Sequence, residues 1–298
     1  MSADRPSLGL TPAPRLAVGV IGVGRAGAPL AAALARAGHP LVGAHAVSER
    51  SRRQMDLFLP AAPLLSAAEV MAAADLVLLT VPDDVLPELV LGLADTGAVT
   101  PGQFVVHASG RFGTAVLEPA TRLGALPMAL HPVMTFTGSR SDLDRLAGCP
   151  FGVTAPLVLR PVAEALVVEM GGDPMWVPEE ARPLYHAALA NGANHLVTLI
   201  AQTLDLLAIA GIDDPAGLVR PLLTAALDNV LAMGDDALTG PVARGDAGTV
   251  AAHLEALSHA APEARAAYVA MARLTADRAL AAGRLDPAAA ESLLDVLT

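Results

Sequence analysis

The chain has 298 residues, a net charge of −11 at pH 7 and a hydrophobic fraction of 53%. At roughly 150 residues per domain this length indicates two domains, and the apolar content excludes a disordered chain. The acidic balance argues against nucleic-acid and anionic-membrane partners, because both require a broad basic face. All 19 basic residues are arginines, which excludes every mechanism that needs a lysine, from a Schiff base to a P-loop.

The cysteine content and the N-terminal segment bear on location. Cys149 is the single cysteine, which excludes a disulfide framework and a multi-cysteine zinc site and favours a reducing compartment. Residues 1–14 contain no apolar run of signal-peptide length, so they are interpreted as a disordered leader. The most apolar helical stretch, 196–212, is interrupted by Gln202 and Asp205 and is shorter than the ~20 residues of a membrane span. We expect a cytoplasmic protein with no membrane partner.

In chain order, a short apolar run at 16–21 enters a glycine-rich turn, and an alanine-rich helix follows to Arg36. Further strands are expected, with helices between most of them, at 41–46, 75–81, 103–108, 125–130, 151–155 and 174–177. This alternation predicts an α/β fold over residues 15–178, a Rossmann-type doubly wound, mostly parallel sheet. Residues 179–298 carry long Ala/Leu stretches without a convincing strand, which predicts an all-helical second domain.

The glycine-rich turn has the pattern G-x-G-x-x-G between a predicted strand and a predicted helix, formed by Gly22, Val23, Gly24, Arg25, Ala26 and Gly27. Gly22 permits the tight turn, Gly24 lets a pyrophosphate approach the backbone, and Gly27 lets the helix pack close to the strand. The helix N-terminus adds free N–H groups and a positive dipole end. The turn therefore predicts dinucleotide binding, with a glycine turn that holds no ligand as the alternative.

The choice between NAD and NADP depends on a segment about 20 residues further along the chain, where an acidic residue would bind the ribose of NAD. That place holds Ser48, followed by Glu49 and by the basic residues Arg50, Arg52 and Arg53. Ser48 and these arginines suit the 2′-phosphate of NADP, so NADP is favoured. The alternatives are a solvated helix start, or Glu49 as a ligand of the NAD ribose.

Three predicted strands end in polar or turn residues. Val81, Pro82 and Asp83 follow the third strand, Ser109 the fourth, and His131 the fifth. Because the carboxyl ends of parallel strands meet at one edge, these places converge on one crevice. Val81, Pro82 and Asp83 are predicted to bind the cofactor, and Ser109 is predicted to orient the substrate carbonyl. His131 is the candidate general acid/base, since an unperturbed imidazole titrates near neutrality; a histidine satisfied by backbone groups is the alternative.

The first helix of the second half carries polar residues at helical spacings, namely His186, Asn191, Asn194 and His195. Burying such groups unpaired costs ~1–3 kcal/mol each, so they bond the neighbouring domain or face a ligand. Asn191 and His195 are predicted to act at the catalytic site, and His186 and Asn194 to bind substrate. Carboxylates at matching spacing are missing, so no metal site is expected.

A later polar, glycine-rich break at 238–249 contains Arg244. A guanidinium can clamp a substrate carboxylate through two parallel hydrogen bonds, which makes Arg244 a candidate substrate ligand. An ion pair between Arg244 and Asp246 within an interhelical loop is the equal alternative.

Several segments in the same order carry a resemblance to a known family. They are the glycine turn, H-A-S-G-R, L-H-P-V-M-T-F, A-N-G-A-N-H-L and L-T-G-P-V-A-R-G-D. Over nearly its whole length the chain resembles DUF2520 proteins, which join a Rossmann-like domain to a helical C-terminal domain within the 6-phosphogluconate-dehydrogenase-like reductases. The resemblance implies an NADP-binding oxidoreductase. Genes of this family often neighbour pantothenate-synthesis genes, which makes ketopantoate a candidate substrate on context.

A more distant similarity to prephenate dehydrogenases concerns the mechanism. Those enzymes place a serine one βα segment before an H-P motif, as Ser109 precedes His131, and then a helix with S-H-L, which Asn194-His195-Leu196 resembles with Asn in place of Ser. The similarity implies that His131 polarises or deprotonates the reacting hydroxyl. β-Hydroxyacid dehydrogenases and ketopantoate reductases use a lysine that this chain lacks, so their mechanism does not transfer.

These inferences predict a reductase that transfers a hydride between NADP(H) and a carbonyl (2-oxo acid) or imine substrate bound between the two domains. The alternative is a catalytically silent NADP-binding sensor or assembly protein. The helical domain is rich in Ala and Leu and has too few charged residues to cover every face. We therefore expect a homodimer formed through this domain, as in related reductases.

Overall fold

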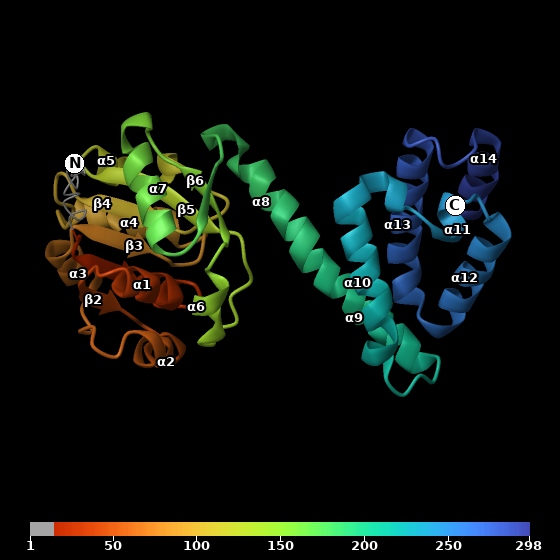
Figure 1. Cartoon of the computed structure of the whole chain (residues 1–298), viewed down its shortest axis with the longest axis horizontal. Helices are drawn as coiled ribbons and strands as arrows, with labels where there is room; N and C mark the ends of the chain where they lie inside the picture. Colours follow the sequence, from red (N-terminus) through yellow and green to blue (C-terminus); the bar gives the residue numbers. More distant parts are fainter. Residues whose placement is uncertain (1–14) are drawn as a thin grey trace, which may run out of the picture. The chain divides into compact units, whose positions relative to one another are not determined.

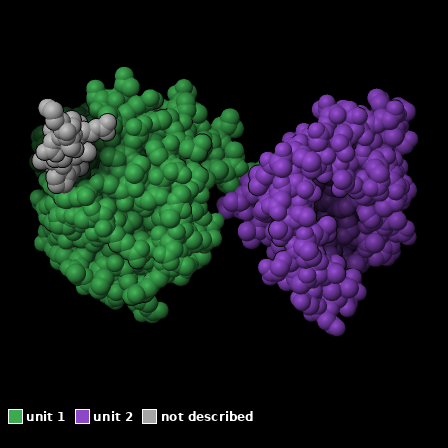
Figure 2. Space-filling model, viewed as in Figure 1, with its two compact units in different colours: residues 1–191 green, residues 192–298 purple. Residues whose placement is uncertain are grey.

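The computed structural model describes residues 15–298, so the leader predicted at 1–14 lies outside the described residues. The chain divides into two compact units, residues 1–191 and residues 192–298 (Figure 2). We call them the sheet unit and the helical unit. The sequence places its boundary after residue 178, where the last predicted strand ends, whereas the sheet unit also includes the next helix.

The sheet unit contains a seven-stranded sheet with the order β2-β1-β3-β4-β5-β6-β7 (Figure 1). The strands are β1 (Val18–Ile21), β2 (Leu41–His45), β3 (Leu76–Leu79), β4 (Phe104–His107), β5 (Leu126–Pro132), β6 (Pro150–Thr154) and β7 (Asp173–Trp176). Neighbouring strands run parallel except for β5 and β6, which pair antiparallel. The prediction of a mostly parallel sheet is confirmed.

The sheet is buried on both faces, which explains the continuous apolar runs of its strands. Every residue of β1 and β3 is buried. On one face, alternate strand residues pack with helices α1 (Gly27–Arg36) and α7 (Arg160–Glu169). On the other face they pack with α3 (Ala67–Ala73) and α4 (Leu86–Asp95).

The parallel strands β1, β3, β4 and β5 lie next to one another, so their carboxyl ends meet at one edge. At a strand spacing of ~4.8 Å, β1 and β5 are about 14 Å apart across this edge. The other helical segments of the sheet unit are α2 (Glu49–Phe58), α5 (Glu118–Thr121), α6 (Ser141–Arg145), α8 (Arg182–Ala190) and the 3-10 turns Thr114–Leu117, Leu157–Leu159 and Glu179–Ala181.

The helical unit confirms the prediction of an all-helical second half. It consists of α9 (Leu196–Ile209), α10 (Pro215–Met233), a 3-10 turn (Gly234–Ala237), α11 (Gly240–Ala243), α12 (Ala247–Ala260), α13 (Pro262–Ala281) and α14 (Pro287–Val296). Its apolar core joins the last four helices through side chains such as Leu254, Ala276 and Leu293. A π-helical turn, Asn191–His195, connects α8 to α9 and contains the boundary between the two units.

Helices α9 and α10 expose much of their apolar surface. Val197 and Leu222 are each 68% exposed and Leu231 is 77% exposed. Two helical stretches, Glu179–Ile209 and Pro215–Ala243, are long and apolar enough to cross a membrane by length and composition alone. The core helix of a soluble protein passes the same test, so this observation selects neither a membrane nor a protein partner.

Candidate functional site

The glycine turn has the geometry that its three glycines predict. Gly22 has a φ of +95°, a left-handed conformation that favours glycine. A Cβ on Gly27 would collide with the Thr80 hydroxyl, so this glycine lets α1 approach the end of β3. Thr80 Oγ1 donates a 2.7 Å hydrogen bond to the carbonyl of Gly22, which fastens the turn to the neighbouring strand.

The middle glycine leaves an open cradle. A Cβ on Gly24 would meet no atom closer than the Gly22 carbonyl oxygen at 4.0 Å. No side chain caps α1 at its N-cap residue, Ala26. The side chain of Val23 is fully buried, so a ligand at this residue could contact only its backbone. The side chain of Arg25 is exposed. An open backbone beside an uncapped helix N-terminus has the form of a phosphate site and fits the dinucleotide that the sequence predicts.

The segment after β3 lies against this turn. Val81 Cγ1 would lie 2.9 Å from a Cβ on Gly22, so these two residues are direct neighbours. Pro82 follows, and its carbonyl accepts from the backbone N–H groups of Val85 and Leu86 at the start of α4. The predicted cofactor residues Val81 and Pro82 therefore lie at the turn, as strand order requires.

The predicted 2′-phosphate segment forms the N-terminus of α2. The Ser48 hydroxyl accepts a 3.1 Å hydrogen bond from the Ser51 backbone N–H and donates to the Ser51 hydroxyl, so it acts as the helix N-cap. Arg53 pairs with Glu49 one turn earlier. Arg50 and Arg52 are exposed at this helix start. The structure thus gives Ser48 a capping role that sequence reasoning did not assign, and it leaves Arg50 and Arg52 exposed at the start of α2.

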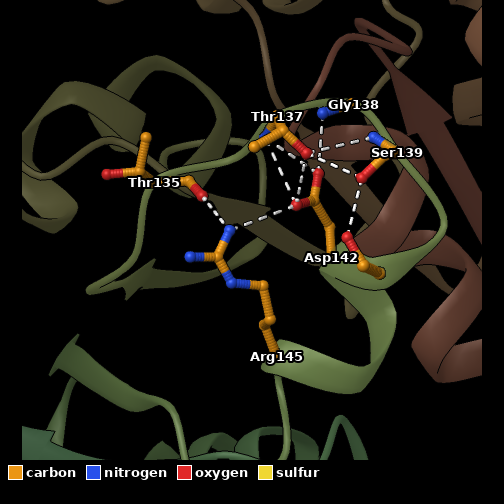
Figure 3. Close-up of polar contacts among 7 residues, drawn as sticks. Thr135, Thr137, Gly138, Ser139, Asp142 and Arg145 are labelled. Carbon is orange, nitrogen blue, oxygen red and sulfur yellow. Dashed lines mark hydrogen bonds and ion pairs between the residues drawn. The ribbon is translucent and has the colours of Figure 1, made fainter. Parts of the chain in front are cut away.

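The loop between β5 and α6 reaches this side of the sheet edge and is held by a buried carboxylate (Figure 3). Asp142 has no exposed surface, and it accepts hydrogen bonds from the backbone and hydroxyl of Thr137 and a 2.7 Å bond from the Gly138 backbone. A Cβ on Gly138 would lie 3.0 Å from Arg25 Cγ. Gln54 Nε2 of α2 donates a 3.2 Å hydrogen bond to the Gly138 carbonyl. The loop therefore contacts both the glycine turn and α2.

The end of β4 is a tightly bonded turn. His107 is fully buried; its Nδ1 accepts from the Ser109 backbone N–H at 3.2 Å, which leaves Nε2 to donate to the Gly113 carbonyl at 2.7 Å. Burial lowers the pKa of His107 to about 4. Ser109 is 8% exposed, and its hydroxyl oxygen accepts from the backbone N–H groups of Arg111 and Phe112. Both side chains shape the turn, and Ser109 keeps only its hydroxyl hydrogen for a ligand.

The end of β5 carries the chemically most promising group. His131 is half-buried, and its Nδ1 shares a 2.8 Å hydrogen bond with the Tyr185 hydroxyl of α8. The ring of His186 lies 6.0 Å from the ring of His131, centroid to centroid. The structure thus brings together His131 and His186, which the sequence singled out, and Tyr185, to which it assigned no role.

The pKa of His131 corrects the expectation of titration near neutrality. Burial, followed by the positive charge of Arg182, lowers the pKa of His131 to about 4. His131 is therefore neutral at pH 7. Burial also raises the pKa of the Tyr185 hydroxyl, so this group keeps its proton.

Arg182 at the start of α8 anchors this cluster, and sequence reasoning missed it. It is fully buried. Its guanidinium donates to the Thr154 hydroxyl and to the carbonyls of Ser109, Ala129 and Gly152, at 2.8–3.3 Å. These bonds join α8 to the ends of three strands, and Tyr185 and His186 follow one turn later on the same helix. Glu179 and Glu180 shortly precede Arg182 in the sequence, so it resembles an ordinary surface arginine, and its position three residues before Tyr185 was the available signal.

The remaining candidates lie at or beyond the boundary of the units. Asn191, Asn194 and His195 are exposed residues of the π-helical turn, a local geometry often found at functional sites. Arg244 is exposed at the end of α11, and Asp246 caps α12 through a 3.1 Å hydrogen bond from the Thr249 backbone. The catalytic roles predicted for Asn191 and His195, and the substrate contacts predicted for Asn194 and Arg244, stay predictions. Within residues 15–298, no group of three or more His, Cys, Asp or Glu side chains is arranged to hold a metal.

The fold and the turn define a Rossmann-type α/β protein with a helical C-terminal half. The comparisons agree, since a Rossmann-like domain model matches residues 2–132 and the model of DUF2520, a domain of unknown function, matches residues 149–275. The chain is thus a two-domain protein of the Rossmann-like and DUF2520 type, and the resemblance seen in the sequence is confirmed. A search of curated proteins found no match to the sequence.

Solved structures share this fold. A Bacteroides fragilis protein provisionally described as an NADP oxidoreductase is 23% identical, with a TM-score of 0.74 over 88% of this chain and 98% of its own. An imine reductase from Pseudomonas sp. is 20% identical, with a TM-score of 0.63 over 96% and 100%. A Plasmodium falciparum pyrroline carboxylate reductase with NADP bound is 12% identical, with a TM-score of 0.54 over 95% and 98%. These likenesses establish the fold and leave the substrate undetermined.

Proposed function

We propose that the protein is an NADP(H)-dependent oxidoreductase that acts on a small carbonyl or imine compound. The observation that carries this proposal is the placement of the open cradle at Gly24 and of His131 on one edge of a parallel sheet. A ligand that starts at the glycine turn must extend about 14 Å along that edge to reach His131. An extended dinucleotide with its phosphates at the turn suits this arrangement.

The residues that would hold the cofactor follow from the contacts described above. The backbone of Gly22–Gly27 and the N-terminus of α1 bind the pyrophosphate, and Val81, Pro82 and Asp83 line the edge beside it. Arg50 and Arg52 supply positive charge for a 2′-phosphate, which favours NADP. When bound, the nicotinamide supplies or accepts the hydride.

His131 handles the proton of the reaction. Because it is neutral at pH 7, it serves as a hydrogen-bond donor to the reacting atom rather than as an imidazolium acid. His186 lies beside it to contact the substrate. Asn191, Asn194, His195 and Arg244 are proposed to contribute further substrate contacts, and a 2-oxo acid such as ketopantoate is the first compound to try.

A titration with NADPH, monitored by the fluorescence of the dinucleotide, tests whether the protein binds the proposed cofactor. Gly24→Val fills the cradle and should abolish tight binding without unfolding the protein. Gly92→Ala is the matched control, since a Cβ on this α4 glycine meets nothing within 4 Å. Absence of NADPH binding to the unmodified protein would refute the proposed function.

Turnover is tested with a panel of 2-oxo acids, including ketopantoate, and cyclic imines, by following NADPH oxidation. Consumption of NADPH with one of these compounds supports the enzyme. Tight binding without turnover over the whole panel favours the alternative of an NADP-binding sensor or assembly protein.

The proposal includes assembly as a homodimer through the helical unit. The apolar side chains on α9 and α10, such as Val197, Leu222 and Leu231, support it, because a second copy would remove them from water. The single, buried Cys149 suits the reducing cytoplasm, which is the proposed location.

A further inference from the structure

We propose that Tyr185 is a positioning residue that keeps the ring hydrogen of neutral His131 on Nε2, from which His131 protonates a substrate oxygen. This inference rests on the proposed function and deepens it, because it selects a carbonyl substrate over an iminium ion. It follows from the hydrogen bond of His131 Nδ1, from the packing of the His131 ring against Gly110 and from the charge of Arg182.

The hydrogen bond between His131 Nδ1 and the Tyr185 hydroxyl is 2.8 Å long, and geometry alone allows either group to donate. The phenol hydrogen decides the direction. Tyr185 is half-buried, and this burial raises the pKa of its hydroxyl, so the phenol keeps a hydrogen that it can donate to Nδ1. The nearby Gly152 carbonyl already accepts from Arg182 at 2.9 Å. Donation by Tyr185 to Nδ1 satisfies the phenol and requires that the imidazole hydrogen be on Nε2.

The position of the His131 ring depends on a glycine. A Cβ on Gly110 would lie 2.8 Å from His131 Nε2 and 2.7 Å from His186 Cδ2, which is too close for both rings. The rings of His131 and His186 therefore pack directly against the Gly110 backbone, and a side chain there would displace them. With His131 held in this position, a carbonyl oxygen that reaches Nε2 would accept its hydrogen.

The charge around His131 favours an oxygen that becomes negative. The Arg182 guanidinium donates its hydrogen bonds to backbone carbonyls and to the Thr154 hydroxyl. The carboxylate whose charge acts on it, Glu179, accepts hydrogen bonds from the Thr114 and Ala115 backbone instead. The other groups that act on His131 are His107 and His186. An iminium nitrogen is positive and has no lone pair to accept from Nε2, so it gains nothing from this arrangement.

In the proposed reduction, the carbonyl carbon would receive the hydride of the reduced nicotinamide, and the π-electron pair of the carbonyl would move to its oxygen. The oxygen takes the hydrogen of His131 Nε2, Nδ1 takes the hydrogen of the Tyr185 hydroxyl, and the phenolate takes a proton from water. Arg182 Cζ lies 5.7 Å from the Tyr185 ring centroid and stabilises that transient negative charge. The products are an alcohol and the oxidised nicotinamide.

The ring-nitrogen NMR spectrum of protein labelled with ¹⁵N-histidine tests the tautomer without a substrate. His131→Asn identifies the His131 signals among those of the eight histidines. We expect a protonated Nε2 and a bare Nδ1, and in Tyr185→Phe a shift towards a mixture of both tautomers. A hydrogen on Nδ1 in the unmodified protein, or an unchanged His131 spectrum in Tyr185→Phe, would overturn the proposal.

The chain offers a matched control. In the helical unit, His253 Nδ1 and the Tyr268 hydroxyl share a hydrogen bond of the same 2.8 Å length. Tyr268→Phe should change the His253 signals and leave those of His131 unaltered. A His131 spectrum that changes equally in Tyr268→Phe would show a general structural effect and contradict a specific role of Tyr185.

Two probes test the substrate class in the presence of NADP. Oxamate resembles a 2-oxo acid and offers a carbonyl oxygen, whereas the pyrrolidinium ion resembles a cationic amine product. Oxamate should shift the Nε2 signal, and Gly110→Ala should abolish the shift, because the added Cβ displaces the His131 ring. A shift caused by pyrrolidinium, or by neither probe, would overturn the carbonyl assignment. Failure of NADP binding is a separate result that refutes the proposed function and leaves the tautomer measurement valid.

Discussion

The sheet unit and the helical unit treat their apolar residues differently. In the sheet unit both faces of the sheet are covered, and Phe151 and Leu76 have no exposed surface. In the helical unit the last four helices form a core, but α9 and α10 leave Leu222 and Leu231 68% and 77% exposed. The sheet unit thus covers both faces of its sheet and contains the candidate site, whereas the helical unit exposes apolar side chains along α9 and α10.

The largest expected effect is on turnover, and it should differ between a histidine of the sheet unit and a histidine of the helical unit. His131→Asn in the sheet unit keeps polarity and removes the exchangeable imidazole proton, so turnover should fall ~10²–10⁴-fold. NADPH affinity should change less than about threefold, or roughly 0.65 kcal/mol. His195→Asn in the helical unit should instead act mainly on KM. Steady-state kinetics and NADPH titration measure both, and unchanged turnover in His131→Asn would remove this residue from the mechanism.

The second prediction compares burial directly. Phe151→Ala opens a cavity in the sheet core and should lower the free energy of unfolding by ~3–5 kcal/mol. Leu231→Ala on exposed α10 should cost less than ~0.5 kcal/mol within one chain. Unfolding in urea is monitored by the fluorescence of Trp176, the single tryptophan, which reports on the sheet unit. Similar losses in both variants would break the comparison.

The third prediction concerns pH. The pKa of His107 is about 4 in the folded chain against 6.5 for the free side chain, so the unfolded chain binds the proton first. Stability is therefore complete above pH 6.5 and falls as the pH is lowered towards 4, by on the order of 3 kcal/mol for this residue. Urea unfolding monitored by Trp176 fluorescence at pH values between 7 and 5 measures this loss of the free energy of unfolding. Most carboxylates have not yet titrated in this range. His107→Gln should remove about half of the pH-dependent loss, because His131 has the same pKa of about 4 and contributes a similar part. An equally steep profile in that variant would assign the effect elsewhere.

The fourth prediction concerns the exposed helices. Light scattering should give a particle of about twice the 30.2 kDa chain mass. Leu222→Asp together with Leu231→Asp should favour the monomer, since each buried leucine contributes ~1.5–3 kcal/mol. Glu255→Gln, on α12, is an exposed control that should keep the assembly. A particle of single-chain mass at micromolar concentration would leave α9 and α10 without their proposed partner.

The smallest effect concerns cofactor choice within the sheet unit. If Arg50 and Arg52 bind the 2′-phosphate, NADPH should bind at least ~10-fold more tightly than NADH, a difference of ~1.4 kcal/mol. Arg50→Ala with Arg52→Ala should erase that difference and leave NADH binding unchanged. Equal affinities in the unmodified protein would show that these arginines are only a solvated helix face.

The sequence alone was enough to predict most helices and strands and the glycine turn. Most of the strands were predictable because a sheet buried on both faces needs short apolar runs between turn residues, whereas β7, at the edge of the sheet, is partly exposed. The turn was predictable because the φ of Gly22, the open side of Gly24 and the close packing at Gly27 each require glycine. These are local requirements, and local requirements leave a pattern in the sequence.

Only the tertiary structure decided how the candidate site is built. His131 and Tyr185 are 54 positions apart, and Arg182 joins strand ends from distant segments, so no spacing in the sequence indicated their contact. The low pKa of His131 arises from burial and from the charge of Arg182, both of which exist only in the folded chain. The exposure of α9 and α10 was also undetermined, because alanine-rich helices form by intrinsic propensity whether or not a neighbour covers them.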